Sequence, residues 1–118
     1  MLPRKIKREK MGVREQERLV YPTHRAFVKR HGCSCPGCDR QPIDFAHLRT
    51  AANSGAGRKP KDSFGISLCR YHHTRAHSIG HDAVARENGT TLEAWFNLAT
   101  EFATRTTDRA LREALQEK

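Results

Sequence analysis

The alternation of hydrophobic and polar positions predicts a pair of short strands in the middle of the chain. In "PIDFAHL", residues 42–48, successive side chains alternate with the two-residue period of a strand. A second segment, "FGISL" at residues 64–68, predicts another short strand. Because a single loop joins the two segments, we expect them to pair antiparallel.

Helical spacing predicts short helices on both sides of this pair. The segment "YPTHRAFVKRHG", residues 21–32, is a helix candidate that Thr23 can cap and Gly32 closes. Directly after the second strand, residues 70–79 predict a helix that Gly80 ends.

The strongest helical pattern lies near the C-terminus. In "TTLEAWFNLATEFATRT", residues 90–106, the apolar side chains form one stripe, and Thr90 with Glu93 predicts a capping box. A last helix is expected over residues 108–116. We interpret both helices as core and scaffold, so the fold class predicted from the pattern is α+β.

Composition predicts a single domain with a thin core. The chain has 118 residues, of which 36% are hydrophobic and 30% are charged. Such small domains commonly rely on a disulfide or a metal for stability. No apolar run reaches the length of a membrane span and no signal-peptide pattern is present, so a cytoplasmic location with reduced thiols is expected. The four cysteines are therefore predicted to be metal ligands rather than disulfides.

The net charge of +9 is unevenly distributed. Residues 1–77 carry 17 Lys and Arg against 6 Asp and Glu, whereas residues 78–118 carry 5 against 7. This asymmetry favours a polyanionic partner, with nucleic acid as the first candidate. Residues 1–20 are predicted to be a basic, flexible arm, and residues 21–118 a single domain.

The cysteines and one histidine have the spacing of a structural zinc site. The segment "CSCPGC" and the pair Cys69 and His72 flank the two predicted strands, each pair near a turn. Thiolate and imidazole ligands favour Zn²⁺ over hard cations. Spacing alone leaves open whether Cys35 or Cys33 joins Cys38 in binding the ion.

A second group of side chains predicts another metal site, with the chemistry of phosphodiester hydrolysis. His73 and His77 share a helix face and can bind one divalent ion, which His47 is expected to face from the first strand. Asp44 is a candidate oxygen ligand, although a bend or bulge near Ala46 is then needed. A bound ion stabilises charge on the phosphate, while a histidine that does not bind the ion deprotonates water.

These motifs resemble those of a known nuclease family. The elements "CSCPGC", "PIDFAHLR", "GAGRKPKD" and "SLCRYHHTRAH" are similar to those of the HNH (ββα-metal) superfamily, and in particular to its phage and prophage recombination-associated group. The resemblance covers about residues 24–104. It implies a zinc-stabilised ββα-metal core at about residues 33–80, with added N-terminal helices and with C-terminal helices at about residues 90–117.

The resemblance also implies roles for individual residues. His47 matches the general base of the family, and His73 and His77 match its metal-binding histidines. For the zinc site, the resemblance favours Cys33 and Cys38 and leaves Cys35 as an alternate.

Two positions depart from the family pattern. Many family members carry Asp or His directly before the base, whereas Ala46 stands here, so Asp44 becomes the substitute ligand. The central Asn of the family has no clear match. Of Asp62 and Asn53, we favour Asp62 as the residue that orients the loop.

Basic residues around the predicted site are candidates for DNA contacts. The glycine-flanked loop between the strands would allow cations to approach phosphates beside the scissile bond. The candidate phosphate contacts are Arg49, Arg58, Lys59, Lys61 and Arg75. No base-reading helix is evident, so low sequence specificity is expected.

The function predicted from the sequence is an HNH-type DNA endonuclease linked to phage or bacterial recombination or repair. Its expected cofactors are a structural Zn²⁺ and one catalytic divalent ion, Mg²⁺ or Mn²⁺ first and Zn²⁺ or Ni²⁺ next. Its expected partners are DNA and a RecA-like recombinase filament, with no membrane and no small-molecule cofactor. The alternatives are a non-catalytic zinc-stabilised DNA-binding or recombination accessory module and a small protein-interaction domain.

Overall fold

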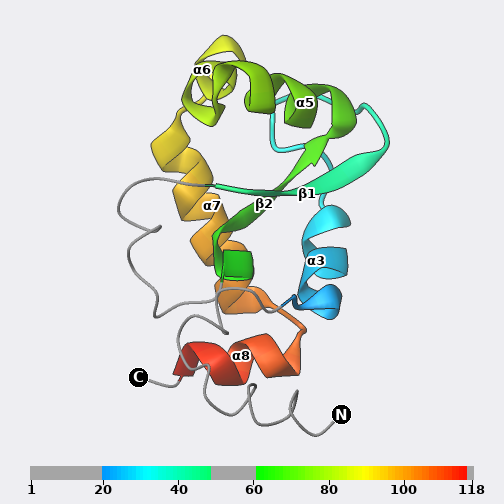
Figure 1. The fold of residues 1–118 in the computed structure, drawn as a ribbon, viewed down its shortest axis with the longest axis vertical. Helices are drawn as coiled ribbons and strands as arrows, with labels where there is room; N and C mark the ends of the chain where they lie inside the picture. The colour runs from blue at the N-terminus through cyan, green and yellow to red at the C-terminus, as the bar shows by residue number, and fades with distance from the viewer. Residues whose placement is uncertain (1–19, 49–60, 117–118) are drawn as a thin grey trace, which may run out of the picture.

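The computed structural model describes residues 20–48 and 61–116 (Figure 1). Within these residues the chain forms a two-stranded sheet, a short 3₁₀ helix and five α-helices. Their order is α3 (Pro22–Lys29), β1 (Ile43–His47), η1 (Lys61–Phe64), β2 (Gly65–Cys69), α5 (Arg70–Ile79), α6 (His81–Glu87), α7 (Leu92–Arg105) and α8 (Arg109–Gln116). No helix in the described ranges is both long and apolar enough to cross a membrane.

The two strands form an antiparallel pair, as the sequence predicted. Ile43 pairs with Cys69 at one end and His47 pairs with Gly65 at the other, with no interruption in the register. The helix α5 begins directly after β2, so β1, β2 and α5 form one strand–strand–helix unit. The predicted α+β class is therefore confirmed.

Helices cover the hairpin and close the core. The helices α3 and α7 both contact β2, and α5 contacts both strands. Figure 1 shows α5 and α6 at one end of the molecule and α8 at the other, with α7 running between them. The largest fully buried apolar side chains are Trp95, Leu48, Ile66, Leu68 and Leu111. This core is small, as the composition predicted.

The helix predicted over residues 70–79 is confirmed at both ends, whereas α3 begins differently from the prediction. The helix α3 begins at Pro22 and is preceded by Tyr21, so Thr23 lies inside the helix and the predicted Thr23 cap is wrong. The reason is that proline has no N–H to cap and its fixed φ suits the first helical position.

Two further helix starts were each predicted one residue too early. Thr91 rather than Thr90 caps α7, because its Oγ1 accepts a hydrogen bond from the backbone N–H of Ala94 at 3.0 Å. Asp108 precedes α8 and accepts a hydrogen bond from the backbone N–H of Leu111 at 3.1 Å. The helix α6 was not predicted at all.

Gly65 allows an aromatic ring to lie directly over the hairpin. A Cβ atom at this position would overlap Cζ of Phe45 and lie 2.6 Å from both Cε atoms of the same ring. We therefore expect Gly65→Ala to lower the free energy of unfolding by about 1–3 kcal/mol through overpacking. Urea unfolding of Gly65→Ala, alone and together with Phe45→Leu, measures this. The smaller side chain should recover part of the loss, and equal stability of Gly65→Ala and the natural protein would contradict the prediction.

Candidate metal centre and active site

Three cysteines and one histidine meet beside the hairpin. Cys33 and Cys38 lie in the segment between α3 and β1, Cys69 ends β2, and His72 lies in the first turn of α5. Their ligand atoms all lie within 4.8 Å of one another. The Nδ1 atom of His72 is 3.2 Å from Sγ of Cys69, 3.5 Å from Sγ of Cys33 and 3.7 Å from Sγ of Cys38. The four residues predicted for the zinc site are thus together.

The separations in this cluster fit a tetrahedral zinc ion. Zinc bonds of about 2.3 Å to sulfur and about 2.0 Å to nitrogen imply ligand–ligand distances of about 3.5–3.8 Å in a tetrahedron. The distance from Sγ of Cys38 to Sγ of Cys69 is 3.9 Å, just above that range, and the three distances from His72 lie around its lower end and middle. Three thiols and one imidazole are also the ligand types of closed structural zinc sites. The cluster can therefore hold a structural zinc ion.

The local environment shifts the pKa values of two of the thiols in opposite directions. Burial alone would raise the pKa of the Cys33 thiol, but hydrogen bonds from the backbone amides of Cys69 and Cys35 lower it below its usual value. Burial raises the pKa of Cys69, and the nearby Cys33 adds to this rise. A divalent cation held by Cys33, Cys38, Cys69 and His72 would offset this repulsion and keep the thiols ionised.

Cys35 lies outside the cluster. Its side chain is 1% exposed and packs in the hydrophobic core, and burial together with Cys33 raises the pKa of this thiol to about 12. Of the two pairings that the sequence left open, the structure therefore brings Cys33 rather than Cys35 to Cys38.

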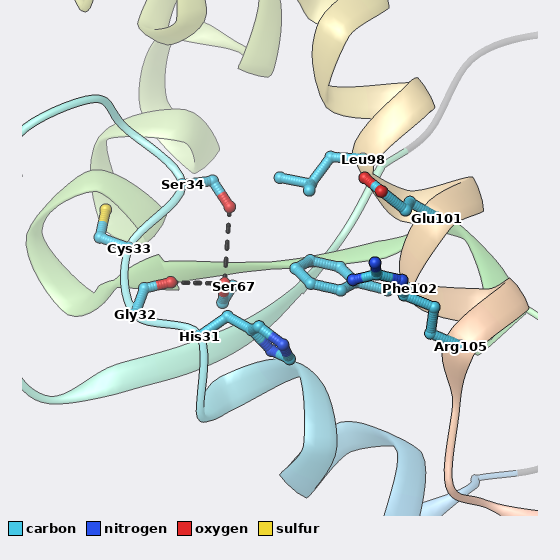
Figure 2. Close-up of a pocket in the computed structure, with 9 residues that line it drawn as sticks. All are labelled: His31, Gly32, Cys33, Ser34, Ser67, Leu98, Glu101, Phe102 and Arg105. Atoms are coloured by element: carbon cyan, nitrogen blue, oxygen red, sulfur yellow. Dashed lines mark hydrogen bonds between the residues drawn. The ribbon is translucent and has the colours of Figure 1, made fainter.

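The segment that carries Cys33 is tied to β2 by hydrogen bonds, shown in Figure 2. The Ser67 hydroxyl donates to the Gly32 carbonyl oxygen and lies 3.5 Å from Oγ of Ser34. The Ser34 backbone N–H donates to the Ser67 carbonyl oxygen at 2.8 Å. These bonds position Cys33 and also form one wall of a hollow of about 310 Å³, whose opposite wall is α7.

A second cluster is centred on His47. The Oδ1 atom of Asp62 accepts a hydrogen bond from Nε2 of His47 at 2.8 Å. The Arg25 guanidinium donates to both carboxylate oxygens of Asp62, at 2.9 and 3.0 Å, and the Tyr21 backbone N–H donates to Oδ2 at 2.8 Å. The Asp62 side chain is 1% exposed. Burial alone would raise the pKa of this carboxyl, but the hydrogen bonds from His47, Arg25 and Tyr21 lower it to about 2.

This contact determines which nitrogen of His47 is available. An ionised carboxylate only accepts hydrogen bonds, so Nε2 carries a proton and Nδ1 is the acceptor in the neutral ring. The sequence predicted Asp62 as a loop-orienting residue, and the structure places it directly on the imidazole. Arg25 and Tyr21 were missed, because they precede Asp62 by 37 and 41 residues and carry no motif.

A third cluster joins Asp44 to the histidines of α5. The Oδ2 atom of Asp44 accepts from Nδ1 of His73 at 3.0 Å, and Arg70 donates to both oxygens of the same carboxylate. The hydrogen bond from Arg70, followed by that from His73, lowers the pKa of Asp44. On the other side of the ring, Nε2 of His73 is 3.3 Å from Nε2 of His77.

The structure bears on two expectations about this site. Asp44 was predicted to bind the ion beside His73, but it contacts the ring nitrogen of His73 that faces away from His77. The expected bulge near Ala46 is absent, because the register between β1 and β2 is regular. In a regular strand the side chains of Asp44 and His47 point to opposite faces. His47 therefore belongs to the Asp62 cluster, and Asp44 to the His73 cluster.

The residues predicted to bind the second metal do not form a compact ligand group among the described residues. Among the described residues, the Cys33, Cys38, Cys69 and His72 set is the group of three or more ligand atoms that lie within 4.8 Å of one another. Asp44, His73 and His77 do not form such a group, so a catalytic ion bound by all three remains a prediction.

His81 was missed by the sequence reasoning. It begins α6, and burial, followed by the neighbouring His73 and His77, lowers the pKa of its imidazole. Its Nε2 atom is buried and has no hydrogen-bond partner among the described residues. The signal that was available is the four-residue spacing of His73, His77 and His81.

The structure describes only some of the residues that were predicted to contact DNA phosphates. Lys61 is exposed in η1, where it is free to approach a phosphate. Arg75 donates to both carboxylate oxygens of Glu87, at 2.8 and 2.7 Å, so its charge is partly compensated. The residues predicted in the loop that lie outside the described ranges are Arg49, Asn53, Arg58 and Lys59.

A comparison with known proteins finds a distant similarity. No family model matches the chain, and no solved structure matches it. Over 88 residues the chain is 34% identical to the "Uncharacterized protein YdfU" of Escherichia coli (strain K12), a match that covers 73% of this chain and 24% of that protein. The chain thus spans about a quarter of the length of this relative, whose name states no activity.

Proposed function

We propose that the chain is a metal-dependent DNA endonuclease of the HNH type, with a ββα-metal core formed by β1, β2 and α5. The observation that carries the proposal is the contact of His47 with Asp62, because a buried carboxylate on a partly exposed imidazole is an arrangement suited to general base catalysis. The resemblance of the sequence motifs to this family supports the same assignment.

In this proposal His47 accepts the proton of the attacking water. Asp62 holds Nε2, so the lone pair of Nδ1 is directed away from the carboxylate and is available to take that proton. The carboxylate also stabilises the imidazolium that forms. Arg25 and the Tyr21 backbone N–H keep Asp62 ionised and fixed, since they occupy its remaining acceptor positions.

His73 and His77 are the proposed holders of the catalytic ion. Their Nε2 atoms are 3.3 Å apart, which is close to the ligand–ligand distance of about 3.3 Å that tetrahedral metal–nitrogen bonds of about 2.0–2.1 Å imply. Asp44 orients His73 through the other ring nitrogen, as carboxylates commonly do behind a metal-binding histidine. When bound, a divalent ion supplies stabilisation of the charge on the phosphate and on the leaving oxygen.

The positions of Asp44 and His47 on β1 limit where the DNA can bind in this proposal. Asp44 and His47 are three residues apart, so their Cα atoms are separated by about 10 Å along the strand. Because these two side chains point to opposite faces of β1, the proposal requires the DNA to pass the edge of this strand, with the attacking water on the side of His47. No described element reads base edges in the manner of a recognition helix, so we expect low sequence specificity.

The biological role that we propose rests only on the resemblance of the sequence motifs to the HNH family. We propose action in phage or bacterial recombination or repair, in a reducing cytoplasm, with DNA and a RecA-like filament as partners. A structural zinc in the Cys33, Cys38, Cys69 and His72 cluster would hold α5 against the hairpin.

One observation favours a second candidate, a non-catalytic zinc-stabilised DNA-binding module. The regular strand register separates His47 from His73 and His77, whereas cleavage needs both groups at one phosphate. A chain that has kept the zinc centre and the basic surface but lost cleavage would bind DNA with the same electrostatics.

Cleavage of supercoiled plasmid distinguishes the two candidates. We expect nicking that requires added Mg²⁺ or Mn²⁺, stops with chelator, and falls about 10²- to 10⁴-fold in His47→Ala, since a general base contributes on that scale. His31→Ala is the matched control, because His31 is exposed at the end of α3 and lies outside both clusters. DNA binding without nicking by any of these ions would support the binding module instead.

A further inference from the structure

The outer face of α5 carries an exposed aromatic side chain in a shallow hollow. Tyr71 has 51% of its surface exposed, which makes it one of the few large apolar side chains exposed among the described residues. The hollow has a volume of about 410 Å³ and is lined by Arg70, Tyr71, Thr74, Arg75 and Ser78. These positions recur at intervals of three and four residues, so they form one continuous helix face.

One cation lies on this aromatic ring, and two others line the same hollow. The Arg40 guanidinium lies over the Tyr71 ring, with its central carbon 4.4 Å from the ring centroid, and makes no ion pair with the described acidic residues. Arg70 and Arg75 are held in place by Asp44 and Glu87. Each of these two guanidinium groups donates two of its five N–H groups to a carboxylate, so three remain for a further acceptor.

The hollow adjoins the proposed catalytic cluster. Arg70 lines the hollow and also donates to the Asp44 carboxylate, which in turn accepts from His73. On α5, Arg70 lies three residues before His73 and seven before His77, so it stands at the border between the two helix faces. A nucleotide held at Tyr71 would therefore have its phosphate near Arg70 and the Asp44 cluster.

We propose that Tyr71, together with Arg40 and Arg70, is a stacking platform for one unpaired base of single-stranded DNA beside the proposed catalytic site. An aromatic ring flanked by cations binds single strands because every base presents a face for stacking and every nucleotide presents a phosphate. The bases of a duplex are stacked on one another and do not offer this face. This proposal adds to the proposed function that the bound DNA is single-stranded. Binding of the strand at Tyr71 does not depend on the nuclease assignment, whereas cleavage of the bound strand does.

Binding of labelled oligo-dT without added Mg²⁺ or Mn²⁺ tests the platform, since cleavage is then switched off while the cluster of Cys33, Cys38, Cys69 and His72 keeps its zinc. We expect Tyr71→Ala to weaken binding of the single strand about 5- to 100-fold, the range that stacking of one base provides, and Tyr71→Trp to retain it. Affinity for a hairpin duplex should change less than 2-fold. An oligonucleotide of abasic sites has the same phosphates, so the effect of Tyr71→Ala should disappear with it.

Controls separate stacking from general damage and from failure of the nuclease assignment. Ile79→Ala removes another exposed apolar side chain of α5 outside the hollow, and it should leave binding unchanged. Zinc content and circular dichroism check that each variant is folded. Equal binding of oligo-dT by the natural protein and Tyr71→Ala, or an equal loss with the duplex, would overturn the platform. Plasmid nicking that depends on His47 would leave the nuclease assignment standing in that case.

Discussion

Cys69→Ser is expected to lose the bound zinc and to unfold the domain at 37 °C. Cys69 belongs to the zinc cluster and also precedes α5, where its sulfur accepts the His72 backbone N–H at 3.4 Å. Structural zinc contributes about 10–16 kcal/mol in small zinc-dependent folds, whereas a domain of this size has a net stability of about 5–15 kcal/mol. Circular dichroism and zinc analysis of the purified variant measure the two losses together. Treatment of the natural protein with a strong chelator should have the same effect.

Cys35→Ala is the matched control for this result. Cys35 lies in the same segment as Cys33 and Cys38 but packs in the core rather than in the cluster. We expect this variant to keep one zinc ion per chain and to lose about 1–2 kcal/mol through a small cavity. Loss of zinc in Cys35→Ala, or a fully folded zinc-free Cys69→Ser, would disagree with the assigned ligand set.

Asp62→Asn is expected to lower the rate of DNA cleavage about 10²- to 10⁴-fold while DNA affinity changes little. The amide can donate as well as accept, so it no longer fixes the proton on Nε2 of His47, and it no longer stabilises the imidazolium. Single-turnover cleavage, corrected for the folded fraction of each variant, measures the rate. Asp39→Asn serves as the control because Asp39 is an exposed carboxylate next to the zinc-binding segment. An unchanged rate in Asp62→Asn would remove His47 from the proposed mechanism.

The same substitution should change how stability depends on pH. The pKa of Asp62 falls from 3.8 to about 2 on folding, so the ionised carboxylate stabilises the folded state above pH 4. That contribution, about 2 kcal/mol, is lost as the pH falls through 2. Urea unfolding of the zinc-loaded proteins at pH 7, where this contribution is fully present and the zinc ligands stay deprotonated, should show Asp62→Asn to be about 2 kcal/mol less stable than the natural protein.

Local patterns were sufficient for most of the secondary structure. The two-residue period identified the first strand. The helix of residues 70–79 was recognised from the four-residue spacing of His73 and His77 and from Gly80, which in the structure ends it with a φ of 96°. The helix α6 was missed because it has only seven residues and no side-chain cap. Its stability comes from packing, since Val84 and Ala85 are fully buried against the rest of the core. Such contacts are not visible in the segment itself.

The metal ligands too could be predicted only in part from local sequence patterns. Ligand spacing along the chain identified Cys38, Cys69 and His72, because two short ligand pairs on turns are typical of zinc sites. The spacing did not distinguish Cys33 from Cys35. That choice depends on the direction of each side chain in the turn, and the folded chain buries Cys35 in the core.

The sequence by itself predicted the α+β class, the strand–strand–helix order and the types of the zinc ligands, since each can be recognised from short segments: the strand and helix patterns, and two ligand pairs that each lie within a few residues. Only the tertiary structure decided that Asp62 holds His47 and that Asp44 stands behind His73. These contacts join residues 15 and 29 positions apart. Hydrogen bonds of that kind depend on which face of β1 each side chain occupies and on what the fold packs against that face, and no local pattern contains this information.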